Sequence, residues 1–134
     1  MTATPARIPT SHLDLLERPL YGHLAMTRPD GQPQVTPMWY VWDGEVLRFT
    51  TTTTRQKYLN AQHESRVALS VNDPEQPYRY LEVRGIIERI DPDPEGHVFD
   101  QLAARYGYAD YQPPVADAPD RIVLVVRPIA TSKQ

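Results

Sequence analysis

Cysteine is absent from the 134-residue chain, which excludes disulfide bonds, thiolate metal sites and cysteine nucleophiles. This absence is typical of proteins from a reducing compartment, and we expect a cytoplasmic protein. The N-terminal residues 1–9 are polar, contain Pro5 and Pro9, and lack the apolar run of a secretion signal. No stretch approaches the roughly 18 consecutive apolar residues that span a membrane, so no membrane partner is expected.

Positive charge is not in excess either, because the formal net charge is -3 at pH 7. Proteins that bind the phosphate backbone normally present a net basic surface, so no nucleic-acid partner is expected and any anion site must be local. The four histidines lack ligand spacing, and no metal site is expected. Neither a Gly-x-Ser-x-Gly elbow, a Walker loop nor a Gly-x-Gly-x-x-Gly fingerprint is present, which excludes serine hydrolases, P-loop proteins and dinucleotide-binding folds of that type.

Short strand-like runs make up most of the chain. Hydrophobic residues account for 40% of it and charged residues for 23%, the balance of a globular protein, and we expect a single domain over residues 1–134. Strands are predicted at residues 21–27, 34–42, 46–51, 67–71, 78–90 and 121–127. Helices are expected only at the margins, near residues 10–18, 55–62 and 95–106. This order predicts a mainly-β, antiparallel barrel with flanking helices, too small to enclose a large cofactor unless two copies form the cleft.

Five consecutive threonines, Thr50 to Thr54, lead from a predicted strand into a helix that begins Arg55-Gln56-Lys57. The first turn of a helix has unpaired N–H groups and a positive dipole end, which attract an anion. Hydroxyls, amides, a guanidinium and an ammonium group are thus predicted to meet one phosphate. The residues alone also allow an ordinary strand end, with Thr54 capping the helix and two solvated cations.

Several segments resemble one family of proteins. They are residues 31–42 (GQPQVTPMWYVW), 47–51 (LRFTT), 55–57 (RQK), 65–70 (SRVALS) and 78–85 (YRYLEVRG). Together they are similar to the pyridoxamine 5′-phosphate oxidase-like superfamily, and within it to the branch of small reductases that use the deazaflavin coenzyme F420. The similarity extends over residues 21–127. It implies the FMN-binding split β-barrel, a homodimer, and a cofactor site at the interface between the subunits.

The resemblance also implies a set of cofactor-binding residues. The loop after the strand would hold the phosphate, and the strand around residue 36 would run along the ring system, with backbone contacts from residues 35–37. Tyr78 would approach the ring from the other subunit. The predicted cofactor-binding residues are Val35, Thr36, Pro37, Met38, Thr50, Thr51, Arg55, Lys57, Asn60 and Tyr78.

The implied activity is an oxidoreductase in which reduced F420 transfers a hydride to a small unsaturated or conjugated molecule. No catalytic acid or base is singled out, and the proton would come from solvent, Tyr78 or Tyr80. Vitamin B6 oxidation is not expected, because the C-terminal arginine-bearing extension of authentic pyridoxamine phosphate oxidases is missing. Two alternatives stay open: an FMN-dependent oxidase or reductase of the same fold, and a flavin- or deazaflavin-binding carrier without turnover. Substrate specificity is assigned to the loops at residues 73–77 and 107–120.

Overall fold

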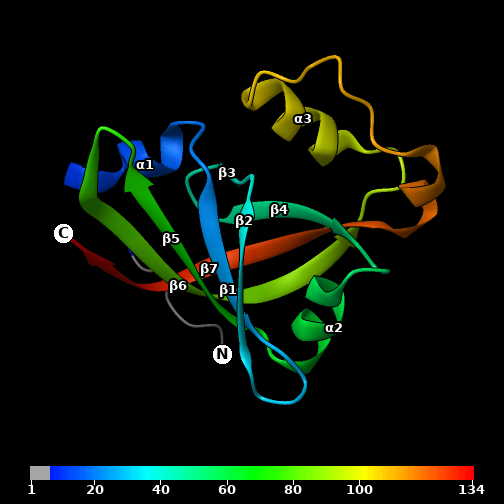
Figure 1. Ribbon diagram of the computed structural model, residues 1–134, viewed down its shortest axis with the longest axis horizontal. Coiled ribbons are helices and arrows are strands. Elements are labelled where there is room, and N and C mark those ends of the chain that lie inside the picture. The colour runs from blue at the N-terminus through cyan, green and yellow to red at the C-terminus, as the bar shows by residue number, and fades with distance from the viewer. Residues whose placement is uncertain (1–6) are drawn as a thin grey trace.

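The computed structural model describes residues 7–134. The prediction that residues 1–9 form no secretion signal therefore falls mostly outside the described residues. One antiparallel sheet with helices at its margins makes up the fold (Figure 1). The strands are β1 (Gly22–Thr27), β2 (Pro33–Met38), β3 (Val41–Trp42), β4 (Leu47–Thr52), β5 (Arg66–Asp73), β6 (Gln76–Pro92) and β7 (Arg121–Lys133). The helices are α1 (Asp14–Glu17), α2 (Gln56–His63) and α3 (His97–Arg105), with 3-10 turns η1 (Thr10–His12) and η2 (Val115–Asp120).

The seven strands follow the order β2-β1-β5-β6-β7-β4-β3, and every pair is antiparallel. The two edge strands, β2 and β3, are consecutive in the chain and are separated by two residues only, Trp39 and Tyr40. The sheet therefore curls until its opposite edges meet at this link. This architecture confirms the predicted mainly-β split barrel with flanking helices.

The prediction of six strands is wrong at one place, because residues 34–42 form two strands instead of one. Tyr40 lies in the link, where its backbone N–H donates to the Tyr106 hydroxyl at 3.1 Å and its carbonyl accepts from Arg105 Nε at 3.0 Å. Its N–H and C=O groups thus bind side chains at the C-terminal end of α3, and not the backbone of a neighbouring strand. Aromatic residues favour strands, so the sequence pattern did not reveal the break.

The core lies inside the curl, where Leu24, Tyr40, Phe49, Leu81 and Leu124 are almost completely buried. A smaller cluster on the outer face joins Val46, Val123 and Val125 to Val98 of α3. Strand β7 is therefore buried on both faces from residue 121 to residue 126, which explains why its apolar run is continuous and does not alternate.

The C-terminal end of α3 is tied to the N-terminal helix by Arg105. Its guanidinium donates to the carbonyl oxygens of Leu16, Glu17 and Arg18 at 2.7 to 3.0 Å. The Tyr106 hydroxyl adds a hydrogen bond to the carbonyl of Leu20 at 2.6 Å. These bonds satisfy carbonyl groups at the end of α1 and fix the point where the loop after α3 begins.

None of the helices in residues 7–134 has the length and hydrophobicity needed to cross a membrane. Within the same residues, no group of three or more histidine, aspartate and glutamate side chains is arranged to hold a metal ion.

Candidate functional site

The threonine run forms a tight corner between β4 and α2. Thr51 and Thr52 are buried, and the Thr52 hydroxyl lies 2.7 Å from the hydroxyl of Thr54. The N–H of Thr53 donates to the carbonyl of Asp120 at 2.9 Å, and the N–H of Arg55 donates to the carbonyl of Thr52 at 3.2 Å. The corner is thus tied both to Thr52 at the end of β4 and to Asp120, the residue that precedes β7.

Helix α2 begins without a side-chain cap. Its N-cap residue is Arg55 in an extended conformation, which makes no side-chain capping hydrogen bond, and the first turn contains no acidic residue. The alternative in which Thr54 caps this helix is therefore wrong, because the Thr54 hydroxyl bonds to Thr52 instead. The positive end of the helix dipole is left without a negative group from its own chain segment.

A cavity of about 210 Å³ opens at this corner and brings together five of the predicted residues: Met38, Thr50, Thr51, Arg55 and Lys57. The opposite wall comes from Phe99 of α3 and from Tyr111, Pro114 and Asp117 of the following loop, and Thr52 and Arg121 complete the lining. The loop at residues 107–120, to which specificity was assigned, thus borders the same cavity as the threonine run.

Positive charge dominates the cavity. Arg55, Lys57 and Arg121 face one carboxylate, that of Asp117, among the lining residues. Burial lowers the pKa of the Lys57 ammonium group from 10.5, and the nearby charge of Arg55 lowers it further. Both effects disfavour the charged form of Lys57, because the ammonium group is partly removed from water and lies close to another cation. The arrangement is suited to a bound anion.

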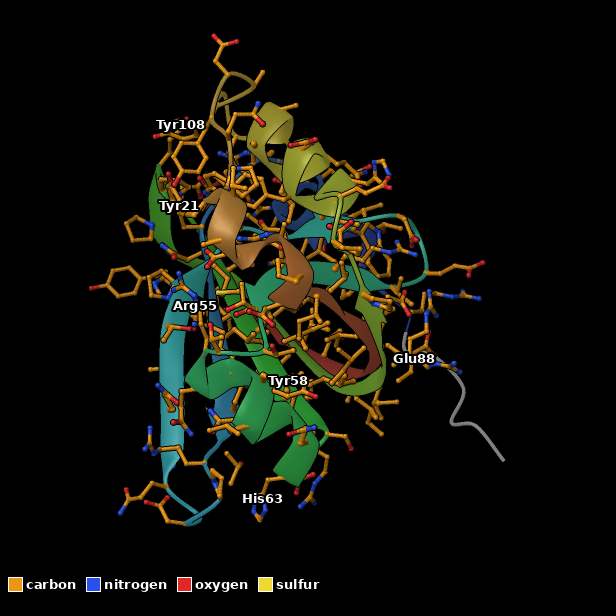
Figure 2. All side chains as sticks on the ribbon, turned by 90° about the vertical axis from the view of Figure 1, so that its right-hand side faces the viewer. Tyr21, Arg55, Tyr58, His63, Glu88 and Tyr108 are labelled. Carbon is orange, nitrogen blue, oxygen red and sulfur yellow. The ribbon has the colours of Figure 1, made fainter. Side chains whose placement is uncertain are left out.

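An apolar hollow of about 300 Å³ adjoins this cavity and shares Met38 and Thr50 with it. Pro37, Trp39 and Tyr21 form its other walls. The indole of Trp39 is stacked between Tyr106 and Tyr108, with ring centroids 5.2 and 5.6 Å away, which fixes its orientation. In Figure 2, Tyr108, Tyr21 and Arg55 follow one another down one side of the molecule. An apolar hollow thus adjoins a cationic cavity.

Four of the predicted residues lie outside the cationic cavity and the apolar hollow. Val35 and Thr36 lie on edge strand β2, where Val35 is 62% exposed. Asn60 is fully buried, and its amide bonds to Gln34 and Gln56 at 2.8 and 2.9 Å, so it ties α2 to β2. Tyr78 is 85% exposed near the hairpin between β5 and β6. Within one chain these four residues do not line either space.

Arg121 and Asp117 are the residues that the sequence analysis missed. Arg121 follows a proline-rich segment and opens a strand, so in the sequence it resembles an ordinary charged strand end. The pairing of Thr52 with Arg121 across β4 and β7 brings it to the threonine corner. A charged residue directly before a continuous apolar run was the available signal, and only the strand register gave it a location.

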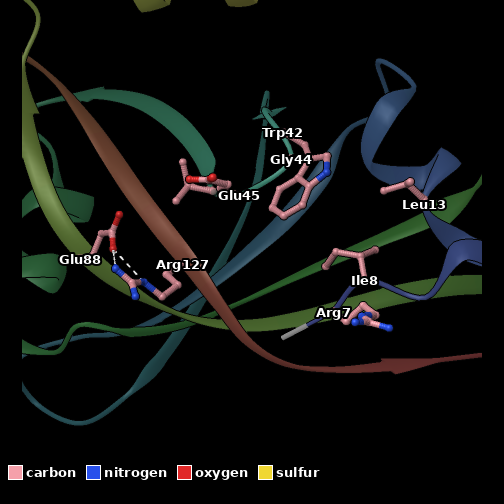
Figure 3. Close-up of a pocket in the computed structure, with 9 residues that line it drawn as sticks. Arg7, Ile8, Leu13, Trp42, Gly44, Glu45, Glu88 and Arg127 are labelled. Carbon is pink, nitrogen blue, oxygen red and sulfur yellow. Dashed lines mark hydrogen bonds and ion pairs between the residues drawn. The ribbon is translucent and has the colours of Figure 1, made fainter. Parts of the chain in front are cut away.

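A larger cavity of about 590 Å³ lies elsewhere, between the segment that begins at Arg7 and the β3–β4 hairpin (Figure 3). Trp42, Glu88 and Arg127 are among its lining residues. The Arg127 guanidinium already binds Glu88, with Nε 2.8 Å from the carboxylate, so its charge is matched within the chain. Size favours this cavity, but the chemistry of its charged groups favours the threonine corner as the anion site.

Comparison with known proteins agrees with the fold. The family described as pyridoxamine 5′-phosphate oxidase matches residues 8–133. The chain belongs to this family. The family predicted from the sequence is therefore confirmed, and the match covers every strand of the sheet.

Solved structures of the family's fold include close and distant ones. A protein named F420 reductase is 58% identical, with a TM-score of 0.89, and the match covers 95% of this chain and 100% of that one. A conserved hypothetical protein from Mycobacterium tuberculosis is 26% identical, with a TM-score of 0.74 over 99% of this chain and 89% of the other. HupZ of Group A Streptococcus shares the fold at 18% identity, with a TM-score of 0.67 and coverage of 95% and 94%. No curated protein matches the chain.

Proposed function

We propose that the chain is an oxidoreductase that binds the deazaflavin coenzyme F420 and reduces a small unsaturated or conjugated organic molecule. The observation that carries this proposal is the 58% identity, over 95% of the chain, to a protein named F420 reductase. The continuous site supports it, because an apolar hollow between Tyr21 and Trp39 adjoins a cavity with three cationic side chains. A cofactor with a ring system joined to a phosphate group requires an apolar space for the ring and a cationic space for the phosphate.

The residues present fit such a cofactor. Arg55 and Lys57 would hold the phosphate at the start of α2, and the Thr50 hydroxyl would mark the boundary between phosphate and ring. Met38 and Pro37 would contact the ring from β2, where Pro37 leaves the strand without one N–H donor. When bound, the reduced deazaflavin supplies a hydride.

The chain's own contribution is orientation and exclusion of water. Trp39 is locked between two tyrosine rings and offers a rigid wall, and the loop at residues 107–120 covers the cavity from the other side. We assign the proton to solvent, Tyr78 or Tyr80. The two tyrosines would come from a second subunit, since Tyr78 lies outside the cavity lining of its own chain.

Cofactor titration tests the proposal. F420 and FMN are titrated side by side into the purified protein by calorimetry, and F420 is expected to bind more tightly by about tenfold or more. Tighter binding of FMN would favour the FMN-dependent oxidase or reductase instead. Oxidation of reduced F420 is then followed with a panel of enones, quinones and tetrapyrroles. Tight F420 binding without oxidation by any of them would favour a carrier protein.

Substitutions at the corner test the site. Arg55→Ala and Lys57→Ala each remove one charge-assisted contact, worth on the order of 1.5–3 kcal/mol, and should weaken F420 binding by roughly 10- to 150-fold. Arg84→Ala is the matched control, because Arg84 lies on β6 with a half-exposed side chain paired to Glu82. A folded Lys57→Ala protein that binds F420 within about twofold of wild type would place the phosphate elsewhere.

A further inference from the structure

Arg121 is a buried cation whose partners in the chain leave it incompletely bound. It is 6% exposed, and one terminal nitrogen donates to the Thr50 hydroxyl at 3.1 Å. Its guanidinium carbon lies 4.7 Å from the centre of the Phe99 ring. The carboxylate of Asp117 is 3.7 Å from the other terminal nitrogen. Charge-assisted hydrogen bonds between such groups usually measure about 2.7–2.9 Å, so Asp117 is close enough to attract but too far to bond well.

One nitrogen of Arg121 has no partner at all. Across the described part of the chain, residues 7–134, Arg121 Nε is the one fully buried side-chain nitrogen or oxygen without a hydrogen-bond partner. A guanidinium has five N–H donors, and a buried charge that is left incompletely paired costs several kcal/mol. A protein that retains such an unfavourable group is expected to need it for function.

Arg105 shows what a structural arginine looks like in the same fold. Its guanidinium donates to four carbonyl oxygens, those of Leu16, Glu17, Arg18 and Tyr40, at 2.7 to 3.0 Å. It closes a helix end, and each of its three nitrogens donates at least one hydrogen bond. Arg121, by contrast, lines the same cavity as Arg55 and Lys57.

We propose that Arg121 is a third cationic ligand of the anion bound at this corner, and that Asp117 is the internal counter-ion that the anion displaces. Three cations and one weakly placed carboxylate leave the cavity short of negative charge, and a phosphate group would supply it. Because Asp117 belongs to η2, the exchange couples occupancy of the cavity to the loop at residues 107–120. The identification of the anion as a cofactor phosphate rests on the proposed function; the roles of the two residues do not.

The sign of the Asp117 effect is the sharpest test. Asp117→Asn removes a competitor for Arg121 and keeps its shape, so inorganic phosphate should bind about three- to tenfold more tightly at constant ionic strength. Asp110→Asn is the matched control, because it removes an equal charge from an exposed position of the same loop and should change affinity by less than about twofold. Unchanged or weaker phosphate binding by Asp117→Asn would overturn the proposal.

A double-mutant cycle separates direct competition from a general change in charge. Arg121→Met should lose at least about tenfold in phosphate affinity, and Arg121→Lys, which keeps the charge without the fork, should lose less. In the Arg121→Met background, the gain from Asp117→Asn should vanish. An undiminished gain in that background would show that Asp117 does not act through Arg121 and would overturn its role as counter-ion.

Thermal melting adds a measure that a purely structural arginine would not change. Phosphate should raise the melting temperature of the wild-type protein more than that of Arg121→Lys, whatever the melting temperatures without phosphate. Equal increments in the two proteins would overturn the role of Arg121 as a ligand, also in the event that Arg121→Met fails to fold. Repeating the titrations with F420 and FMN separates the two proposals. If phosphate responds as stated and neither cofactor binds, the anion site stands and the proposed function fails.

Discussion

At the scale of single residues, Lys57 combines partial burial with a neighbouring like charge. Both effects favour the neutral amine, with burial the larger, and the pKa of Lys57 is lowered from 10.5. A bound anion acts in the opposite direction, because it favours the ammonium form. Anion binding above the lowered pKa must therefore be accompanied by uptake of a proton.

This linkage gives a pH-dependence. As the pH rises through the lowered pKa of Lys57 toward 10.5, the affinity for inorganic phosphate should fall, because protonation must then be achieved together with binding. Lys57→Arg carries a permanent charge, so its affinity should vary less over the same range, and calorimetry at a series of pH values measures both proteins. Identical pH profiles for the two proteins would show that Lys57 is not the titrating ligand.

The residues found from sequence and those missed differ in how far apart they lie in the chain. Thr50, Arg55 and Lys57 belong to one short segment, and a strand followed by a helix start is enough to bring their groups together. Arg121 reaches them only through the pairing of β4 with β7, and Asp117 only through a loop without regular hydrophobic pattern. Strand register across a sheet depends on the whole fold, so these two positions could not be derived from local patterns.

At the scale of elements, the hairpin between β3 and β4 is built on Asp43. Its carboxylate accepts the N–H groups of Glu45 and Val46 at 2.8 and 2.9 Å and pairs with Arg48, while Gly44 adopts a φ of 99°. Burial alone raises the pKa of Asp43, but the hydrogen bonds from Val46, Arg48 and Glu45 outweigh it and lower the pKa from 3.8 to about 2. The Asp-Gly turn predicted from the sequence thus carries its own stabilising network.

Loss of this network should have a pH signature. Asp43→Ala should lower the free energy of unfolding by about 1 kcal/mol at neutral pH, as measured by denaturant titration. Because the pKa is depressed in the folded state, the contribution is present above pH 3.8 and is lost as the pH falls through about 2. The difference between wild type and variant should shrink over that window. Glu45→Ala, in the same turn, is the control and should change stability by less than about 0.5 kcal/mol.

Element types were largely predictable, and element ends were less so. The alternation along β6 and the start of a helix after the threonines agree with the structure. Strand β7 continues to Lys133, beyond the predicted end at residue 127, because residues 127–133 pair with β6 across one irregularity of register. That pairing compensates for the lower hydrophobicity of the segment. Tertiary hydrogen bonds of this kind have no counterpart in a local pattern.

At the scale of the whole molecule, we predict a homodimer with a cofactor site completed by the second subunit. Several large hydrophobic side chains are at least half exposed, among them Val35, Leu59 and Tyr78. They lie on β2, on α2 and beside the β5–β6 hairpin, elements that carry the predicted cofactor residues. If a second subunit covered these side chains, their exposure in one chain would be explained. The position of Tyr78 outside the cationic cavity of its own chain would be explained as well.

Light scattering checks the mass, which should be twice the 15.3 kDa of one chain. Tyr78→Ser should weaken F420 binding by about tenfold while leaving the affinity for inorganic phosphate unchanged, since only the ring would contact this residue. Val115→Ser is a suitable control, because Val115 is 89% exposed and lies outside the linings of the cationic cavity and the hollow. A monomer that binds F420 with full affinity would contradict the interface site.

The loop that follows α3 has both of its ends fixed to the sheet and to α1. Arg105 and Tyr106 hold its beginning, and the bond from the Thr53 N–H to the Asp120 carbonyl holds its end. Between these points the loop borders the cavity without belonging to a strand. The segment at residues 108–119 is therefore suited to replacement by the corresponding loop of a related protein. Such a replacement should change which molecules the site accepts while the barrel stays the same.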